Sequence, residues 1–203
     1  LYFFTLQKLP ISTAAVLQYL SPIFTAIFGI WILREPVKKY QWLFFAVSFS
    51  GVAVIKGFNP DLQLQYFLAG LGSAIFAGFA YNCIRILRKT EQPVVVVFYF
   101  PLVATPIMLV TTLFFWVQPQ GIDWLWILLM GVFTQVGQVY MTKALQADVA
   151  SKIASFKYLG IVYAIGFDLF IFGEVMYWHT LLGISLVLIG VLSNVRLRGR
   201  FSI

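Results

Sequence analysis

Two charged residues, Lys157 and Asp168, lie in a predicted span that is otherwise mostly apolar, aromatic or small (residues 153–172). At the centre of a membrane-spanning helix an ionisable side chain costs about 2.5–3.5 kcal/mol on insertion scales, so such residues usually face protein or water and serve a function. The two are eleven residues apart. On a helix this places them near one face but about 16 Å apart, so they cannot form a direct salt bridge.

Each of the two has a structural and a functional interpretation. Lys157 is expected about one helical turn from the end of its span, so it either snorkels to the lipid headgroups or anchors a substrate in an inner cavity. Asp168 is either an interfacial residue near the opposite end or a site for the coupling proton or cation.

Further candidates are amide and tyrosine side chains inside apolar segments. Gln135 and Gln138 are three residues apart, so they share a helix face, and a lipid-facing amide would be costly. Helix packing and substrate contact are both open for this pair. The same two interpretations are open for Tyr81 and Asn82 in the span 66–84. The predicted substrate-binding set is Gln18, Tyr19, Tyr81, Asn82, Gln135, Gln138, Lys157 and Tyr158.

The sequence lacks the residue patterns that disulfide bonding, metal binding, catalysis and nucleotide binding require. The chain has one cysteine, Cys83, and one histidine, His179, which excludes a disulfide framework and a cysteine-rich metal site. No nucleophile–base pair, nucleotide-binding GxxxxGK[ST] loop or cofactor motif is present, so we predict no catalytic residue, metal or cofactor.

Composition identifies the elements that must position these residues. The 203-residue chain is 61% hydrophobic and 10% charged, with a mean hydropathy of +0.91, whereas soluble domains have about 45–50% apolar and 25% charged residues. This is an integral membrane protein of all-α, polytopic class. Spanning helices need about 20 apolar residues, and seven runs approach or reach that length: 14–33, 40–55, 66–84, 94–117, 124–142, 153–172 and 178–195.

The basic residues indicate the orientation. When the connections alternate across the bilayer, one side receives only Lys8 and Lys56, and the other receives eleven basic residues, from Arg34 to Arg200. Lys and Arg accumulate in cytoplasmic loops, so the net charge of +7 needs no nucleic-acid partner. We predict a multi-pass protein of the cell (inner) membrane with a cytoplasmic C-terminus.

The sequence also repeats itself at a constant offset of 139 residues, without a gap. Ser12 aligns with Ser151, Tyr19 with Tyr158, and Glu35 with Glu174; Gly51 also matches Gly190. The second copy of the repeat holds five spans, an odd number, so equivalent spans of the two copies cross the membrane in opposite directions. Inverted repeats of this kind build alternating access in many secondary transporters.

The repeat predicts the domain boundaries. Residues 1–56 form the C-terminal part of the first repeat, 57–65 an external loop, 66–195 the second repeat and 196–203 a basic cytoplasmic tail. Mapping the second repeat onto the first leaves roughly 70–80 residues of the first unaccounted for. We therefore expect ten spans in the intact protein and seven, plus a remnant of another, here.

The pattern AAVLQYLSPIFTAIFGIWILREP (residues 14–36), then SGVAVI and a late GE…GISLVLIGVL, resembles the EamA-type branch of the drug/metabolite transporter superfamily. The resemblance covers the whole chain. It implies ten spans in two five-helix repeats, with both termini cytoplasmic, and export of small metabolites such as amino acids. The second copy departs from the pattern, because Gly160 and Ile161 replace Ser21 and Pro22; a kink is expected at Pro22 alone.

The function predicted from these observations is secondary transport, outward and without ATP, of a small polar metabolite by alternating access. The alternative is an intramembrane enzyme acting on a lipid-linked substrate. The expected partners are the small-molecule substrate and the lipid bilayer, with a homodimer left open.

Overall fold

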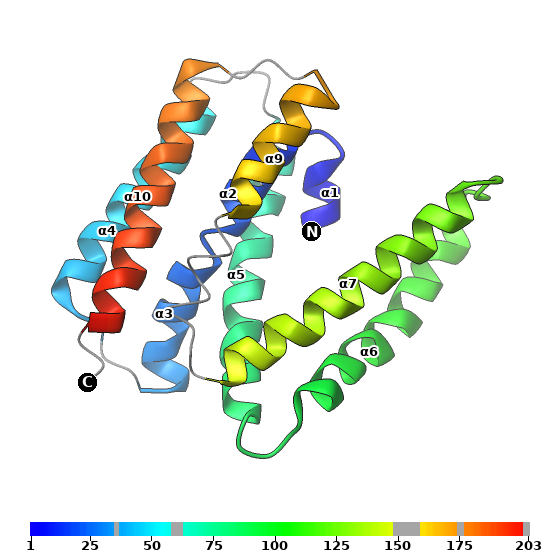
Figure 1. Cartoon of the computed structure of the whole chain (residues 1–203), viewed down its shortest axis with the longest axis horizontal. Coiled ribbons are helices and arrows are strands. Elements are labelled where there is room, and N and C mark those ends of the chain that lie inside the picture. The colour runs from blue at the N-terminus through cyan, green and yellow to red at the C-terminus, as the bar shows by residue number, and fades with distance from the viewer. Residues whose placement is uncertain (35–36, 58–62, 148–158, 174–176, 201–203) are drawn as a thin grey trace. The chain divides into compact units, whose positions relative to one another are not determined.

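The computed structural model describes residues 1–34, 37–57, 63–147, 159–173 and 177–200. The chain divides into two units, Leu1–Asn82 with Ser151–Ile203, and Cys83–Ala150. Every regular element in the described ranges is a helix: α1 (Tyr2–Leu6), α2 (Ile11–Gln18), α3 (Ser21–Ile32), α4 (Lys39–Gly57), α5 (Leu64–Leu87), α6 (Pro93–Phe114), α7 (Asp123–Gln146), α9 (Leu159–Phe170) and α10 (Trp178–Arg200) (Figure 1).

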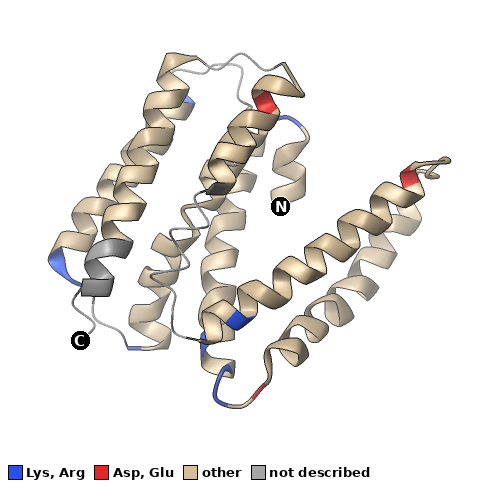
Figure 2. Cartoon of the chain, viewed as in Figure 1, with Lys and Arg blue, Asp and Glu red and all other residues tan. Residues whose placement is uncertain are grey.

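The helices have the lengths and compositions of membrane spans. Four are long and apolar enough to cross a bilayer, namely Ile11–Ile32 (α2 with α3), α5, α6 and α7, and shorter apolar stretches lie in α9 and α10. Charged residues gather at helix ends and connections, while the helix shafts are almost free of charge (Figure 2). The all-helical, multi-pass membrane class is confirmed.

Helices α4 and α10 pack closely along their length and supply much of the buried core of the first unit. Glycine makes this approach feasible. A Cβ atom on Gly51 of α4 would lie 2.6 Å from the carbonyl oxygen of Gly183 and 2.8 Å from the backbone nitrogen of Val187, both in α10. No side chain fits there, so the two backbones are in direct contact.

The same contact occurs a second time with the helices exchanged. A Cβ atom on Gly190 of α10 would lie 2.6 Å from the carbonyl oxygen of Phe44 and 2.9 Å from the backbone nitrogen of Ser48, both in α4. Adding 139 to positions 44, 48 and 51 gives 183, 187 and 190, so the offset found in the sequence converts one contact into the other. Reciprocal contacts of this kind arise when a two-fold axis relates paired elements.

One polar contact in this helix pair breaks the reciprocity. The Gln41 Nε2 group donates a buried hydrogen bond of 3.0 Å to Asn194 Oδ1. The positions related to them by the offset hold Thr180 and Ile55, which cannot make the same bond. The bond between Gln41 and Asn194 therefore has no equivalent at the related positions of α4 and α10.

Candidate functional site

The span Ile11–Ile32 is interrupted close to its middle. Helix α2 ends at Gln18 and α3 begins at Ser21, so Tyr19 and Leu20 lie in a turn about 12 Å from the start of the span. Pro22 explains the break, because it has no N–H to donate to the Gln18 carbonyl. The next N–H, that of Ile23, donates to Leu20 (2.9 Å), three residues back. The kink expected at Pro22 is confirmed.

A break of this kind changes what the middle of a span can bind. Backbone groups in an α-helix are bonded within the helix, whereas an interrupted helix offers carbonyls and N–H groups to a ligand. The Gln18 carbonyl accepts no hydrogen bond from a described residue. In membrane transporters, discontinuous helices of this type form substrate and ion sites near the bilayer midplane.

The Gln18 side chain is held in place by α5. The Ser73 hydroxyl lies 2.7 Å from Gln18 Oε1 and 2.8 Å from the Gly70 carbonyl oxygen, so its one proton is shared between two acceptors. Gln18 is only half-buried, and its Nε2 group has no acceptor among the described side chains and backbone groups. The fixed amide can therefore donate to a ligand.

Tyrosines surround the same break. Tyr2 of α1 and Tyr81 of α5 lie within electrostatic range of the Tyr19 side chain. Gly160 of α9 packs against the Tyr19 hydroxyl, and a Cβ atom there would overlap it. Four helices, α1, α2, α5 and α9, thus converge on one half-buried patch with amide and hydroxyl groups. Of the predicted residues, Gln18 and Tyr19 adjoin the break, and Tyr81 lies on α5 within electrostatic range of Tyr19.

Asn82 is buried and joins two helices. Its Nδ2 group donates 3.0 Å hydrogen bonds to the carbonyl oxygens of Thr25 in α3 and Gly78 in its own helix. Gly78 is itself pressed against α3, at Phe24 and Thr25. Of the two interpretations left open by the sequence, helix packing accounts for these bonds, and substrate contact stays a prediction.

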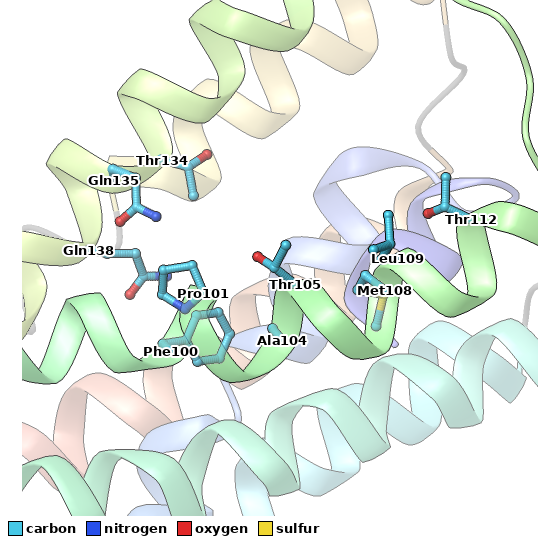
Figure 3. A pocket seen from close by; sticks show the side chains of 10 residues that line it. All are labelled: Phe100, Pro101, Ala104, Thr105, Met108, Leu109, Thr112, Thr134, Gln135 and Gln138. Carbon is cyan, nitrogen blue, oxygen red and sulfur yellow. The ribbon is translucent and has the colours of Figure 1, made fainter.

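Gln135 and Gln138 belong to the second unit, where they face α6 (Figure 3). With Thr105 of α6 they line an open groove of about 370 Å³ between α6 and α7. Its remaining lining is apolar apart from two threonines: Phe100, Pro101, Ala104, Met108, Leu109, Thr112 and Thr134. The groove is large enough for a small metabolite and has few polar groups, as ligand pockets do.

Asp168 has a role that neither interpretation of the sequence included. Its side chain is only 1% exposed. The two carboxylate oxygens accept hydrogen bonds from the backbone N–H groups of Ile11 (2.9 Å) and Ser12 (2.8 Å), the first two residues of α2. These N–H groups have no partner inside their helix, and the positive end of the helix dipole favours an anion there. Asp168 thus caps α2 from α9.

Two predicted residues, Lys157 and Tyr158, lie outside the described residues. Conversely, the structure adds Ser73 and Tyr2 to the group around Gln18 and Tyr19. Ser73 stands beside Gly70 and Ala74 on a face of small residues, a pattern that indicates close helix contact and could have suggested it. Tyr2 has no comparable signal, since only the packing of α1 brings it near.

A family of membrane proteins matches nearly the whole chain. The EamA-like transporter family matches residues 1–57 and 64–196. The chain belongs to the EamA-like transporter family. A crystal structure of another protein has a TM-score of 0.67 with this chain, covering 98% of it and 71% of that protein at 19% sequence identity, which supports the fold.

Named relatives within this superfamily are membrane transporters. The chain is 29% identical to a pseudopaline exporter of Pseudomonas aeruginosa over 95% of its length and 68% of that protein. It is 28% identical to human solute carrier family 35 member G1, covering 96% of this chain and 57% of the carrier. An S-adenosylmethionine uptake transporter of Rickettsia prowazekii is 25% identical, over 81% of this chain and 56% of that transporter. The chain thus spans between about half and two thirds of these relatives.

Proposed function

We propose that the protein is a secondary transporter that exports a small polar metabolite such as an amino acid by alternating access, without ATP hydrolysis by this chain. The observation that carries the proposal is the interruption of the Ile11–Ile32 span at Tyr19 and Leu20, with polar groups gathered around it. The family and its named relatives favour transport over an intramembrane enzyme.

The groups at the break suit a substrate with hydrogen-bond donors and acceptors. The Gln18 carbonyl can accept from an ammonium or amide group, and the Gln18 Nε2 group can donate to a carboxylate or carbonyl. Tyr19 and Tyr81 add an aromatic surface with hydroxyl groups. Lys157 and Tyr158, the repeat counterparts of Gln18 and Tyr19, are proposed to complete the site. Gln135 and Gln138 are proposed as substrate contacts in the groove of their own unit.

Relatives leave the direction of transport to be settled by experiment, because one is named an exporter and another an uptake transporter. Export is proposed from the resemblance in the sequence and from the relative that shares 29% identity. Location in the inner membrane, a cytoplasmic C-terminus and a coupling role for Asp168 belong to the same proposal.

The test is transport by the purified full-length protein in proteoliposomes, with a panel of radiolabelled amino acids and other small polar metabolites. We expect flux that follows a substrate or proton gradient, without nucleotide. Gln18→Leu should lower kcat/KM by about tenfold, the effect of losing one hydrogen bond of about 1.4 kcal/mol to the substrate.

Gln65→Leu is the matched control, because Gln65 is an exposed amide at the start of α5 that bonds only to Gln63 among the described residues. It should leave kcat/KM unchanged. Strict ATP dependence would contradict secondary transport. Equal kcat/KM in the Gln18→Leu, Gln65→Leu and unmodified proteins would remove the α2–α3 break from the substrate site.

A further inference from the structure

The contact between Asp168 and α2 joins the two repeats. Asp168 lies in α9, in the second repeat, whereas Ile11 and Ser12 begin α2, in the first. The hydrogen bonds therefore connect residues 157 and 156 positions apart in the chain. They lie where α2 begins and α9 approaches its end, which is the predicted external end of both helices.

We propose that this contact is a latch: it holds the two repeats together at this end of the protein and must break whenever this end opens during transport. The opening of the latch during transport rests on the proposed function. The closed contact between Asp168 and α2 does not depend on it. A carboxylate bonded to two backbone N–H groups in a buried place is held strongly when closed. Separating α9 from α2 would leave the carboxylate and both N–H groups without partners unless water enters.

When this end of the protein opens, water can enter and bind the separated groups. The face of α9 that carries Asp168 is packed tightly in the closed arrangement, since Ala164, one turn away, is 4% exposed and Ile161, two turns away, is 1% exposed. A buried charge without partners is costly, so a partly opened latch without water is unfavourable. The latch should therefore be either closed and dry or open and hydrated, which is the two-state behaviour that a gate requires.

The carboxylate of the latch has no counterpart at the related position of the first repeat. The residue related to Asp168 by the offset of 139 is Gly29 in α3, which has no side chain to accept a hydrogen bond. A gate built from the related positions of the first repeat therefore lacks this carboxylate. This asymmetry should bias the resting protein toward the conformation that is closed where α2 begins.

The first experiment measures that bias by cysteine labelling, which needs no substrate. In the full-length protein with its native cysteines replaced, Cys83 included, Ala164→Cys places a reporter on the buried face of α9, one turn before Asp168. Whole cells are treated with a membrane-impermeant maleimide. Adding Asp168→Asn removes the charge and one acceptor, and should raise the labelling rate about 10- to 100-fold, the population shift expected from one charge-assisted hydrogen bond.

Asp123→Asn is the matched control. Asp123 is an exposed acid in the first turn of α7 whose carboxylate also accepts a backbone N–H, that of Gln120 at 3.0 Å, but within one loop. It should leave the labelling rate of the reporter unchanged. An unchanged rate in Asp168→Asn, or an equal increase in both variants, would overturn the latch.

The second experiment keeps the test decisive should Asp168→Asn fold poorly. Cysteines replace Ser12, whose hydroxyl has no hydrogen-bond partner in the described structure, and Asp168. Oxidation should cross-link them and stop transport, and reduction should restore it. Full transport by the cross-linked protein would refute an opening latch, and failure of the pair to cross-link would contradict the contact. If no metabolite is transported but labelling responds as expected, the proposed function fails and the latch stands.

Discussion

Replacement of Gly51 by alanine is the most direct test of the α4–α10 contact. The added methyl group would lie 2.6 Å from the Gly183 carbonyl oxygen and 2.8 Å from the Val187 nitrogen. Both are backbone atoms, so no side-chain rotation relieves the overlap and the helices must move apart. Overpacking of this kind costs about 1–3 kcal/mol, and the better helix propensity of alanine returns up to about 1 kcal/mol.

The expected net loss is therefore about 1–2 kcal/mol, which corresponds to a fall in Tm of roughly 2–8 °C for a chain of this size. The assay is thermal unfolding of the purified full-length protein in detergent. Because the Gly190 contact is the reciprocal of the Gly51 contact, one separation of the helices relieves both. The double variant Gly51→Ala with Gly190→Ala should thus lose less stability than the sum of the single variants.

Gly137 provides the control, since no atom other than the nearby backbone of α7 and its two chain neighbours lies within 4 Å of the Cβ position on this residue. Gly137→Ala should leave Tm unchanged or raise it slightly, because alanine is favoured over glycine inside helices. The reasoning would be refuted if Gly51→Ala raised Tm as Gly137→Ala does. A loss of stability in the double variant equal to the sum of the single losses would show that the two contacts are independent of each other.

Two further predictions concern single side chains. Asn194→Ala removes the acceptor for the buried Gln41 amide and should lower stability by about 0.6–1.7 kcal/mol, the range for hydrogen bonds between membrane helices; thermal unfolding measures it, and a Tm equal to that of Ser193→Ala would contradict it. Lys157→Gln and Lys157→Arg should both reduce transport at unchanged expression, because a bulkier planar guanidinium does not replace a compact ammonium. Lys152→Gln should have little effect on transport. Full flux in both Lys157 variants would show that this lysine only snorkels to the lipid headgroups.

The features that the sequence predicted are those that depend on local composition and chain repetition. Long apolar runs must form helices in a bilayer, because the lipid offers no partner for backbone polar groups. A proline in the middle of such a run removes one helical hydrogen bond wherever the helix packs, so the break before Pro22 was predictable. The offset of 139 residues, read from the sequence alone, relates the Gly51 and Gly190 contacts in the structure.

The partners of the polar side chains were decided by tertiary structure. Asp168 was an isolated acid in an apolar run, and nothing nearby in the sequence indicates that it accepts hydrogen bonds from Ile11 and Ser12. Likewise, Ser73 bonds to Gln18, 55 residues away. Side-chain hydrogen bonds act over about 3 Å, so a partner is fixed only once helix packing has set the rotation and height of both helices. Local sequence determines each helix and its polar positions, but not which of those positions come within reach of one another.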